Sequence, residues 1–219
     1  MNENSRGIEI VKQQGQGGVS ITVGGESVST QGKPLDVQLS KQQAYVYLLT
    51  DCSGSMSGYK LDQAKQGILN FATDALKNDY RVGLISFDTE ARLICEPVGD
   101  IQILTPGVRA MRVGGSTNMV KAIKLAHDKL KGLVGTRVIV MATDGMPDNA
   151  DATLKAARAA KDAGIDFIAI GTDDANQNFL GKLATRQDLA AKVSSDMFAQ
   201  AIASASNLLP APRGIIKRQ

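Results

Sequence analysis

The sequence predicts an α/β fold in which helices cover both faces of a doubly wound, mostly parallel sheet. From residue 44 onward, short apolar segments alternate with longer segments whose apolar residues recur at helical spacing. The short segments are apolar at consecutive positions, which is typical of strands that are buried on both faces. Alternation of this kind specifies a parallel sheet with helices packed on either side.

The first half of this pattern contains three strands and one long helix. AYVYLLT (44–50) and RVGLISF (81–87) are continuous apolar segments, and we predict that both are buried strands. Between them, residues 60–77 place their apolar side chains on one helical face. The segment RLICEPV follows a DTEA turn, and we expect residues 90–98 to form an edge strand that runs back antiparallel.

The second half repeats the alternation of strands and helices. RVIVMAT is the third strongly buried segment, and an alanine-rich helix is expected to end before Gly164. The predicted strands are 137–143 and 166–171, and the predicted helices are 118–131, 151–163, 176–186 and 195–208.

Residues 1–41 differ in composition and are predicted to form a separate N-terminal extension. They are rich in Gly, Gln and Ser, and the short alternating pieces IEIV and VSITV predict two or three short strands. The same composition is also typical of poorly ordered sequence, which is the alternative. We therefore divide the chain into this extension, a main domain over residues 42–209 and a basic tail over residues 210–219.

The composition argues against several classes of protein. A net charge of +3 is too small to indicate nucleic-acid binding. Two cysteines and one histidine are too few for a disulfide framework or a tetrahedral zinc cage. The longest apolar run, VIVMAT, is far shorter than a membrane span, and the polar start MNENSRG does not resemble a signal peptide. We expect a cytoplasmic protein that binds neither nucleic acid nor membrane.

Polar residues gather where the predicted strands end. Asp51 directly follows the strand 44–50, and Asp144 directly follows the strand 137–143. These strands are neighbours in the usual doubly wound order, and ligands of such sheets bind outside the carboxyl ends of the strands. Thr117 lies in VGGSTNM, just before a predicted helix, and should approach the same edge. A nucleophile, a phosphate-binding loop and a cation site are three alternatives for this edge, and an ordinary turn is the fourth.

A nucleophile or a phosphate-binding loop fits these residues poorly. The segment nearest to a Gly-x-Ser-x-Gly elbow is GSMSG (54–58), which has Met56 at its centre. The single histidine, His127, falls inside an amphipathic helix, and Cys52 is expected to be a small core residue. The sequence contains neither a Gly-x-x-x-x-Gly-Lys-Ser/Thr loop nor a Gly-x-Gly-x-x-Gly segment after a strand.

A cation site fits the residue types. Hard divalent cations prefer oxygen ligands, and Mg²⁺ takes six of them. Asp51, Ser53 and Ser55 alternate along one loop, so their side chains can face one point, while Thr117 adds a hydroxyl and Asp144 a second carboxylate. Because the hydroxyls are neutral, a bound ion would keep much of its charge and could accept an oxygen from another molecule.

Two further acids, Asp148 and Asp151, lie in the segment DGMPDNAD near the start of a predicted helix. Their spacing does not match the Asp-x-Asp-x-Asp-Gly pattern of a calcium loop. Acids and amides in this position normally cap a helix. We therefore expect capping in preference to a second cation site.

The candidate ligands resemble the metal-ion-dependent adhesion site of von Willebrand factor type A domains. DCSGS (51–55) is similar to the family's Asp-x-Ser-x-Ser element, GGST (114–117) to its Gly-Gly-x-Thr element, and TDG (143–145) to its Thr-Asp-Gly element. Each element is common by itself, but three in this order at predicted strand ends are specific. The resemblance covers about residues 42–209.

The resemblance implies six strands with one antiparallel edge, and a Mg²⁺ or Mn²⁺ ion. It implies that Ser53 and Ser55 bind the ion directly and that Asp51 and Asp144 often act through water. For Thr117 it implies contact that is either direct or through water.

The resulting hypothesis is a metal-dependent protein-interaction module that captures an Asp or Glu side chain of a partner and is not an enzyme. A metal-assisted phosphoester hydrolase is an alternative, although no catalytic base is evident. A structural scaffold with a vestigial metal site is another. The chain also resembles small stand-alone bacterial type A domain proteins, which implies a partner such as an ATPase of the MoxR or magnesium-chelatase type, or a stress-response complex.

Overall fold

The computed structural model describes residues 9–11, 20–23, 26–29, 39–41, 43–212 and 214–216, with side chains placed in 43–212. These residues fall into two units, of which one spans residues 41–213. The other unit contains an antiparallel sheet of β1 (Glu9–Val11), β2 (Ser20–Val23) and β3 (Glu26–Ser29). A two-stranded sheet pairs β4 (Leu39–Lys41) with β11 (Gly214–Ile216). The predicted pieces IEIV and VSITV coincide with β1 and β2, whereas the rest of the predicted extension and tail lies largely outside the described residues.

The unit over residues 41–213 is built on a six-stranded sheet with the order β10-β9-β8-β5-β6-β7. All neighbouring strands are parallel except β6 and β7, so the predicted antiparallel edge is confirmed. The pairing of β5 with β8 confirms that the two acid-bearing strands are neighbours. The six strands are β5 (Ala44–Asp51), β6 (Tyr80–Phe87), β7 (Ala91–Val98), β8 (Thr136–Thr143), β9 (Asp166–Thr172) and β10 (Ala190–Val193).

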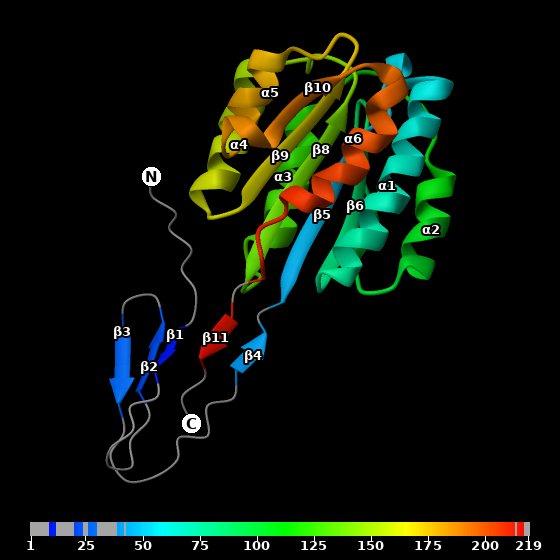
Figure 1. The fold of residues 1–219 in the computed structure, drawn as a ribbon. Coiled ribbons are helices and arrows are strands. Elements are labelled where there is room, and N and C mark those ends of the chain that lie inside the picture. Colours follow the sequence, from blue (N-terminus) through cyan, green and yellow to red (C-terminus); the bar gives the residue numbers. More distant parts are fainter. Residues whose placement is uncertain are drawn as a thin grey trace. The chain divides into compact units, whose positions relative to one another are not determined.

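Helices cover both faces of this sheet, as predicted (Figure 1). One face carries α1 (Tyr59–Lys77), α2 (Ile101–Ala110) and α6 (Phe198–Ser204), and the other carries α3 (Met119–Leu130), α4 (Ala150–Asp162) and α5 (Gln177–Leu183). The side chains of β5 alternate between the two cores: Val46 and Leu48 pack in the first, and Tyr47 and Leu49 in the second. A continuous apolar strand therefore supplies both cores at once.

The helix ends follow local signals in the sequence. Asn118, Asn149 and Asn176 cap α3, α4 and α5 by accepting hydrogen bonds from backbone N–H groups in the first turn. Gly164, just after α4, has a φ of +74°, a conformation that glycine adopts without steric penalty. Within the part of the chain that the structure describes, every helix is too short or too polar to cross a bilayer.

Two elements escaped the sequence pattern. Helix α2 contains Pro106 and Gly107, which are poor helix formers, yet Leu104 and Val108 are buried and Asp100 accepts a hydrogen bond from the Gln102 N–H at 2.8 Å. Strand β10 is a short segment, AAKV, which is held by parallel pairing with β9. The predicted helix over 195–208 is helical throughout but divides into a 3₁₀ turn, the α-helix α6 and a second 3₁₀ turn.

Candidate metal centre

Asp51 is the last residue of β5, and its side chain is completely buried. Its Oδ1 accepts a hydrogen bond from the Ser53 N–H at 2.8 Å, and its Oδ2 accepts one from the Thr143 hydroxyl at 2.6 Å. Thr143 ends the neighbouring strand β8, so the parallel pairing of β5 and β8 brings both side chains to one edge of the sheet. A donor from the loop after β5 and a donor from β8 therefore fix the orientation of the carboxylate.

The two serines of the 51–55 loop are linked to Asp144, which directly follows β8: Ser55 contacts it directly and Ser53 contacts Ser55. The hydroxyl oxygens of Ser53 and Ser55 are 3.1 Å apart. Ser55 Oγ donates to Asp144 Oδ1 at 2.8 Å, although the two residues are 89 positions apart in the chain. Asp51, Ser53, Ser55 and Asp144 thus form one hydrogen-bonded cluster together with Thr143.

Thr117 reaches the same edge through its backbone and that of the preceding glycines. The Gly114 N–H donates to the Cys52 carbonyl at 2.6 Å, and the Gly54 N–H donates to the Gly115 carbonyl at 3.0 Å. These bonds place the 114–117 loop against the 51–55 loop. Within the residues that the structure describes, however, the Thr117 hydroxyl is not part of the hydrogen-bonded cluster formed by the other four candidate ligands.

Asp148 holds this loop in place, and the expectation that it caps a helix is wrong. Its carboxylate accepts hydrogen bonds from the Thr117 N–H at 3.0 Å and the Ser116 hydroxyl at 2.8 Å. Its own N–H donates to the Thr117 carbonyl at 3.1 Å. The cap of α4 is Asn149, one residue later, so Asp148 lies outside the helix and is free to reach across to the neighbouring loop.

Asp88, after β6, packs against Gly114 from the other side. A Cβ atom at Gly114 would lie 1.8 Å from Asp88 Oδ2, which means that only glycine fits there without a shift of the carboxylate. Burial raises the pKa of Asp88, but the hydrogen bond and charge of Arg92, 2.9 Å away, outweigh this effect and hold the pKa below its usual value. The Asp88 carboxylate is therefore negatively charged and packs directly against the glycine loop.

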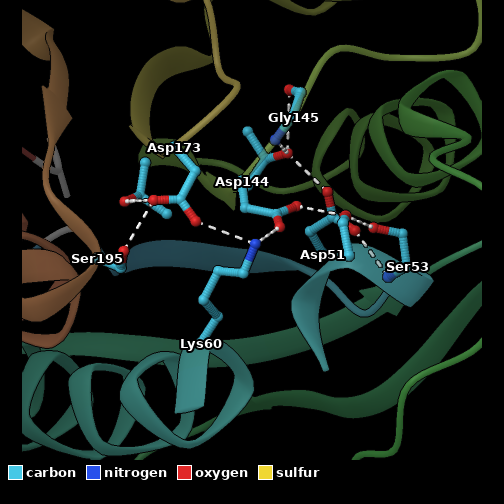
Figure 2. A network of polar contacts seen from close by, with 10 residues as sticks. Asp51, Ser53, Lys60, Asp144, Gly145, Asp173 and Ser195 are labelled. Atoms are coloured by element: carbon cyan, nitrogen blue, oxygen red, sulfur yellow. Dashed lines mark hydrogen bonds and ion pairs between the residues drawn. The ribbon is translucent and has the colours of Figure 1, made fainter. Parts of the chain in front are cut away.

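A lysine and an aspartate that the motif did not indicate extend the cluster. Lys60 Nζ, from the first turn of α1, lies 2.5 Å from Asp144 Oδ2 and 3.0 Å from Asp173 Oδ2 (Figure 2). Asp173 directly follows β9, and its Oδ1 accepts a hydrogen bond from the Ser195 hydroxyl at 2.8 Å. The position of Asp173 at the end of a buried strand was the signal in the sequence that could have found it.

The cluster concentrates negative charge in a largely buried setting. Burial raises the pKa of Asp51 to about 6, and the nearby charge of Asp144 adds to this effect, against the hydrogen bonds from Ser53 and Thr143. Desolvation lowers the pKa of Lys60, but the hydrogen bonds and charges of Asp144 and Asp173 outweigh it and leave that pKa raised. Lys60 is therefore a firmly charged cation beside the cluster.

The donor set fits a hard divalent cation. Every side-chain donor of the cluster is an oxygen, and two are carboxylates whose mutual repulsion favours a nearby positive charge. Among residues 43–212, no group of three or more His, Cys, Asp or Glu side chains is arranged to hold a metal ion. A cation at this edge would accordingly depend on the two aspartates and the hydroxyls.

The fold and these loops match a known domain family. A model of the von Willebrand factor type A domain matches residues 46–205, which is more than half of the chain. The chain belongs to the von Willebrand factor type A domain family. Domains of this family are protein-interaction modules. Among curated proteins, the human von Willebrand factor A domain-containing protein 3B is 30% identical over 114 residues, which cover 50% of this chain and 8% of the human protein.

Solved type A domain structures share the fold at low sequence identity. The vWF domain of the type V pili tip protein Mfa5 from Porphyromonas gingivalis is 14% identical, with a TM-score of 0.70 over 81% of this chain and 99% of that one. Proximal thread matrix protein 1 from the mussel byssus, solved with a zinc-occupied MIDAS motif, is 18% identical, with a TM-score of 0.67 over 77% of this chain and 48% of that one. At these identities the likeness supports the fold alone.

Proposed function

We propose that residues 43–212 form a cation-dependent protein-binding module in which Asp51, Ser53, Ser55, Thr117 and Asp144 hold Mg²⁺ or Mn²⁺. The bound ion would supply a positive charge that accepts a carboxylate oxygen from an Asp or Glu side chain of a partner. The observation that carries the proposal is the hydrogen-bonded chain from Ser53 through Ser55 to Asp144, which unites the ends of β5 and β8. The backbone bonds between the 51–55 and 114–117 loops bring the fifth residue to the same edge.

Exposed apolar side chains around this edge favour a protein partner. Tyr59 begins α1, Val113 precedes Gly114, Met146 follows the Thr-Asp-Gly turn, and Met197 lies in the 3₁₀ turn after β10. These side chains are 59%, 44%, 43% and 42% exposed, respectively. Because all four follow or precede carboxyl-end loops of the sheet, the partner surface that fits here presents an acidic residue flanked by apolar ones.

The arrangement supports binding rather than catalysis. A hydrolase that used the same ion would need a base near the cluster. His127 lies eight residues beyond the first residue of α3, which corresponds to about 12 Å along the helix axis. The Cys52 thiol is buried in the core, and burial raises its pKa to about 12, so it does not serve as a nucleophile.

The proposal extends to a cellular setting. A type A domain that captures an acidic side chain through a metal ion would suit an adaptor beside an ATPase of the MoxR or magnesium-chelatase type, or in a stress-response complex. A cytoplasmic location is part of the same proposal.

Titration calorimetry with MgCl₂ and MnCl₂ tests the metal site. Ser53→Ala should weaken binding by at least about tenfold, because it removes one donor of the cluster. Ser57→Ala is the matched control, since this exposed hydroxyl lies two residues beyond Ser55 and should leave affinity unchanged. Equal affinity of Ser53→Ala and Ser57→Ala for Mg²⁺ and Mn²⁺ would contradict the proposed set of ligands.

Pull-downs with the full chain in magnesium and in chelator test the partner function. A partner retained by the wild type in magnesium, and lost in chelator and in Ser53→Ala, supports the proposal. Retention that is indifferent to metal contradicts it. Turnover of phosphoesters that vanishes in Ser53→Ala would support the hydrolase alternative instead.

A further inference from the structure

We infer that the Lys60 ammonium and a divalent ion compete for Asp144, and that the ion binds by displacing Lys60 from Asp144, with Asp173 as the remaining acceptor of Lys60. This inference rests on the proposed function and concerns how that site controls its own affinity for metal. Lys60 belongs to none of the three motifs that carry the family resemblance. It is a positioning residue, because it acts on the ion through Asp144.

Both oxygens of Asp144 are already engaged. Oδ1 accepts from the Ser55 hydroxyl, and Oδ2 lies 2.5 Å from Lys60 Nζ. The Asp144 side chain is 1% exposed, so bulk water cannot take the place of either partner. The serine hydroxyl can rotate and turn its lone pairs toward a cation, whereas an ammonium group has only protons to offer. The ammonium therefore competes directly with a metal ion for Asp144.

The local charges favour such an exchange. The Lys60 ammonium pairs with Asp144 and Asp173, and Asp51 lies in the same hydrogen-bonded cluster as Asp144, so three carboxylates and one ammonium leave a net charge of two negative among these four side chains. A divalent ion would neutralise that charge, and the displaced Lys60 would keep one carboxylate partner. Lys60 is 23% exposed and sits near the start of α1, so its long side chain can move without disturbing the core.

Asp173 is oriented to accept the Lys60 ammonium. Its φ is +46°, in the left-handed region that non-glycine residues rarely occupy. Ser195 donates to Oδ1 at 2.8 Å, which leaves Oδ2 directed at Lys60 at 3.0 Å. A backbone held in this uncommon conformation beside a ligand site is often part of how the site works. Asp173 thus shares the Lys60 ammonium with Asp144.

Calorimetric titration of the full chain with MnCl₂ and with MgCl₂ tests the exchange. Lys60→Met should bind both ions roughly tenfold more tightly, because it removes a positive charge within a few ångströms of the ion. Lys60→Arg should bind like the wild type, since it restores the charge. Lys77→Met is the matched control, because Lys77 lies on the same helix, 2.8 Å from the exposed Asp74 and at the opposite end.

Asp173→Asn provides a second arm. The variant should bind metal several-fold more weakly, because Lys60 then has only Asp144 as a carboxylate partner. Lys60→Met combined with Asp173→Asn should match Lys60→Met alone if Asp173 acts through Lys60. An equal loss of metal affinity on Asp173→Asn in the wild type and in Lys60→Met would overturn the role assigned to Asp173. Unchanged or weaker binding in Lys60→Met would overturn the whole inference.

Melting curves in chelator and in MnCl₂ show that each variant is folded, and they supply a readout independent of calorimetry. The melting temperature of Lys60→Met should be lower than that of the wild type in chelator, and it should rise more than that of the wild type on addition of MnCl₂. Metal binding by the wild type with no change in Lys60→Met leaves the proposed function intact and removes only the exchange. Absence of metal binding in both proteins removes both, whereas binding in Lys60→Met alone would support the exchange in its strongest form.

Discussion

The two flanks of the candidate metal centre are built in different ways. On the flank of β8 and β9, Asp144, Lys60 and Asp173 meet through charge, and the ammonium has two alternative partners. On the flank of the glycine loop, backbone hydrogen bonds and close packing hold Gly114 between Cys52 and Asp88. The first arrangement would allow the exchange of cations proposed above, while the second has almost no room to move.

Because of this difference, one side of the candidate site has a fixed geometry, and the other side has ion pairs that can change partners. Steric packing fixes the position of the Thr117 loop, because a buried carboxylate and a backbone carbonyl cannot be displaced at low cost. Ion pairs at a partly exposed position are worth much less individually and can be exchanged. Substitutions on the two flanks should consequently differ in their main effect: those on the loop flank should mainly lower stability, and those on the charged flank should mainly change the affinity for metal.

The largest expected effect is that of Gly114→Ala. The added Cβ would lie 1.8 Å from Asp88 Oδ2, and relieving this overlap should lower the free energy of unfolding by about 1–3 kcal/mol. Gly99→Ala is the control, since a Cβ there meets no atom within 4 Å. Urea unfolding followed by circular dichroism measures both, because the chain has no tryptophan. Equal stability of the two variants would show that the loop is not tightly packed.

Asp148→Ala should have the next largest effect. It removes the acceptors for the Thr117 N–H and the Ser116 hydroxyl, so the loop loses two hydrogen bonds at the metal centre. We expect a loss of stability of about 1 kcal/mol and a drop in Mn²⁺ affinity of about threefold to tenfold. Asp151→Ala, in the first turn of α4, serves as the control. A similar drop in both variants would mean that overall negative charge, rather than the loop contact, sets the affinity.

A smaller effect is expected from the titration of Asp88. Burial raises its pKa, but Arg92 and the Glu90 N–H lower it further, so the folded-state pKa lies below the ordinary value of 3.8. The folded protein then binds this proton less readily than the unfolded chain, and the stabilisation is complete above that value and lost as the pH falls through the folded-state pKa. Urea unfolding at about pH 5 and about pH 3 should show a smaller acid-induced loss for Asp88→Asn than for the wild type. An identical loss would assign the acid sensitivity to other carboxylates.

The reactivity of the two cysteines tests the comparison between the two flanks. Labelling of the folded protein should have almost no effect on its stability. Cys52 is 1% exposed and burial raises its pKa to about 12, whereas Cys95 lies partly exposed on the edge strand β7. A thiol reagent at neutral pH should label Cys95 in the folded protein and Cys52 only on opening of the site. Gly114→Ala should speed the labelling of Cys52, and Lys60→Met should not. Equal acceleration in both would indicate that the flanks are not independent.

The main strands and most of the helices could be predicted from the sequence because their signals are local. Continuous apolar runs indicated strands buried on both faces, and helical periodicity indicated the helices that cover them. Helix α2 and strand β10 escaped this approach. Pro106 and Gly107 oppose a helix locally, and AAKV is a weak strand former; packing of Leu104 and Val108 and pairing with β9 decided both elements.

The candidate ligands were also indicated by the sequence, since each lies in a short motif, either directly after a predicted strand or, for Thr117, in a loop just before a predicted helix. Their surroundings were not: the sequence contains many lysines and aspartates, and nothing in its local pattern distinguishes Lys60 or Asp148 from the others, while the signal for Asp173 was its position directly after a buried strand. Only the order of the strands and the packing of α1 bring these side chains to the same edge as Asp51 and Asp144. The sequence by itself determined the fold class and indicated the candidate oxygen donors, because periodicity and motifs act over a few residues. The tertiary structure alone decided which charges surround those donors, because that depends on contacts between segments far apart in the chain.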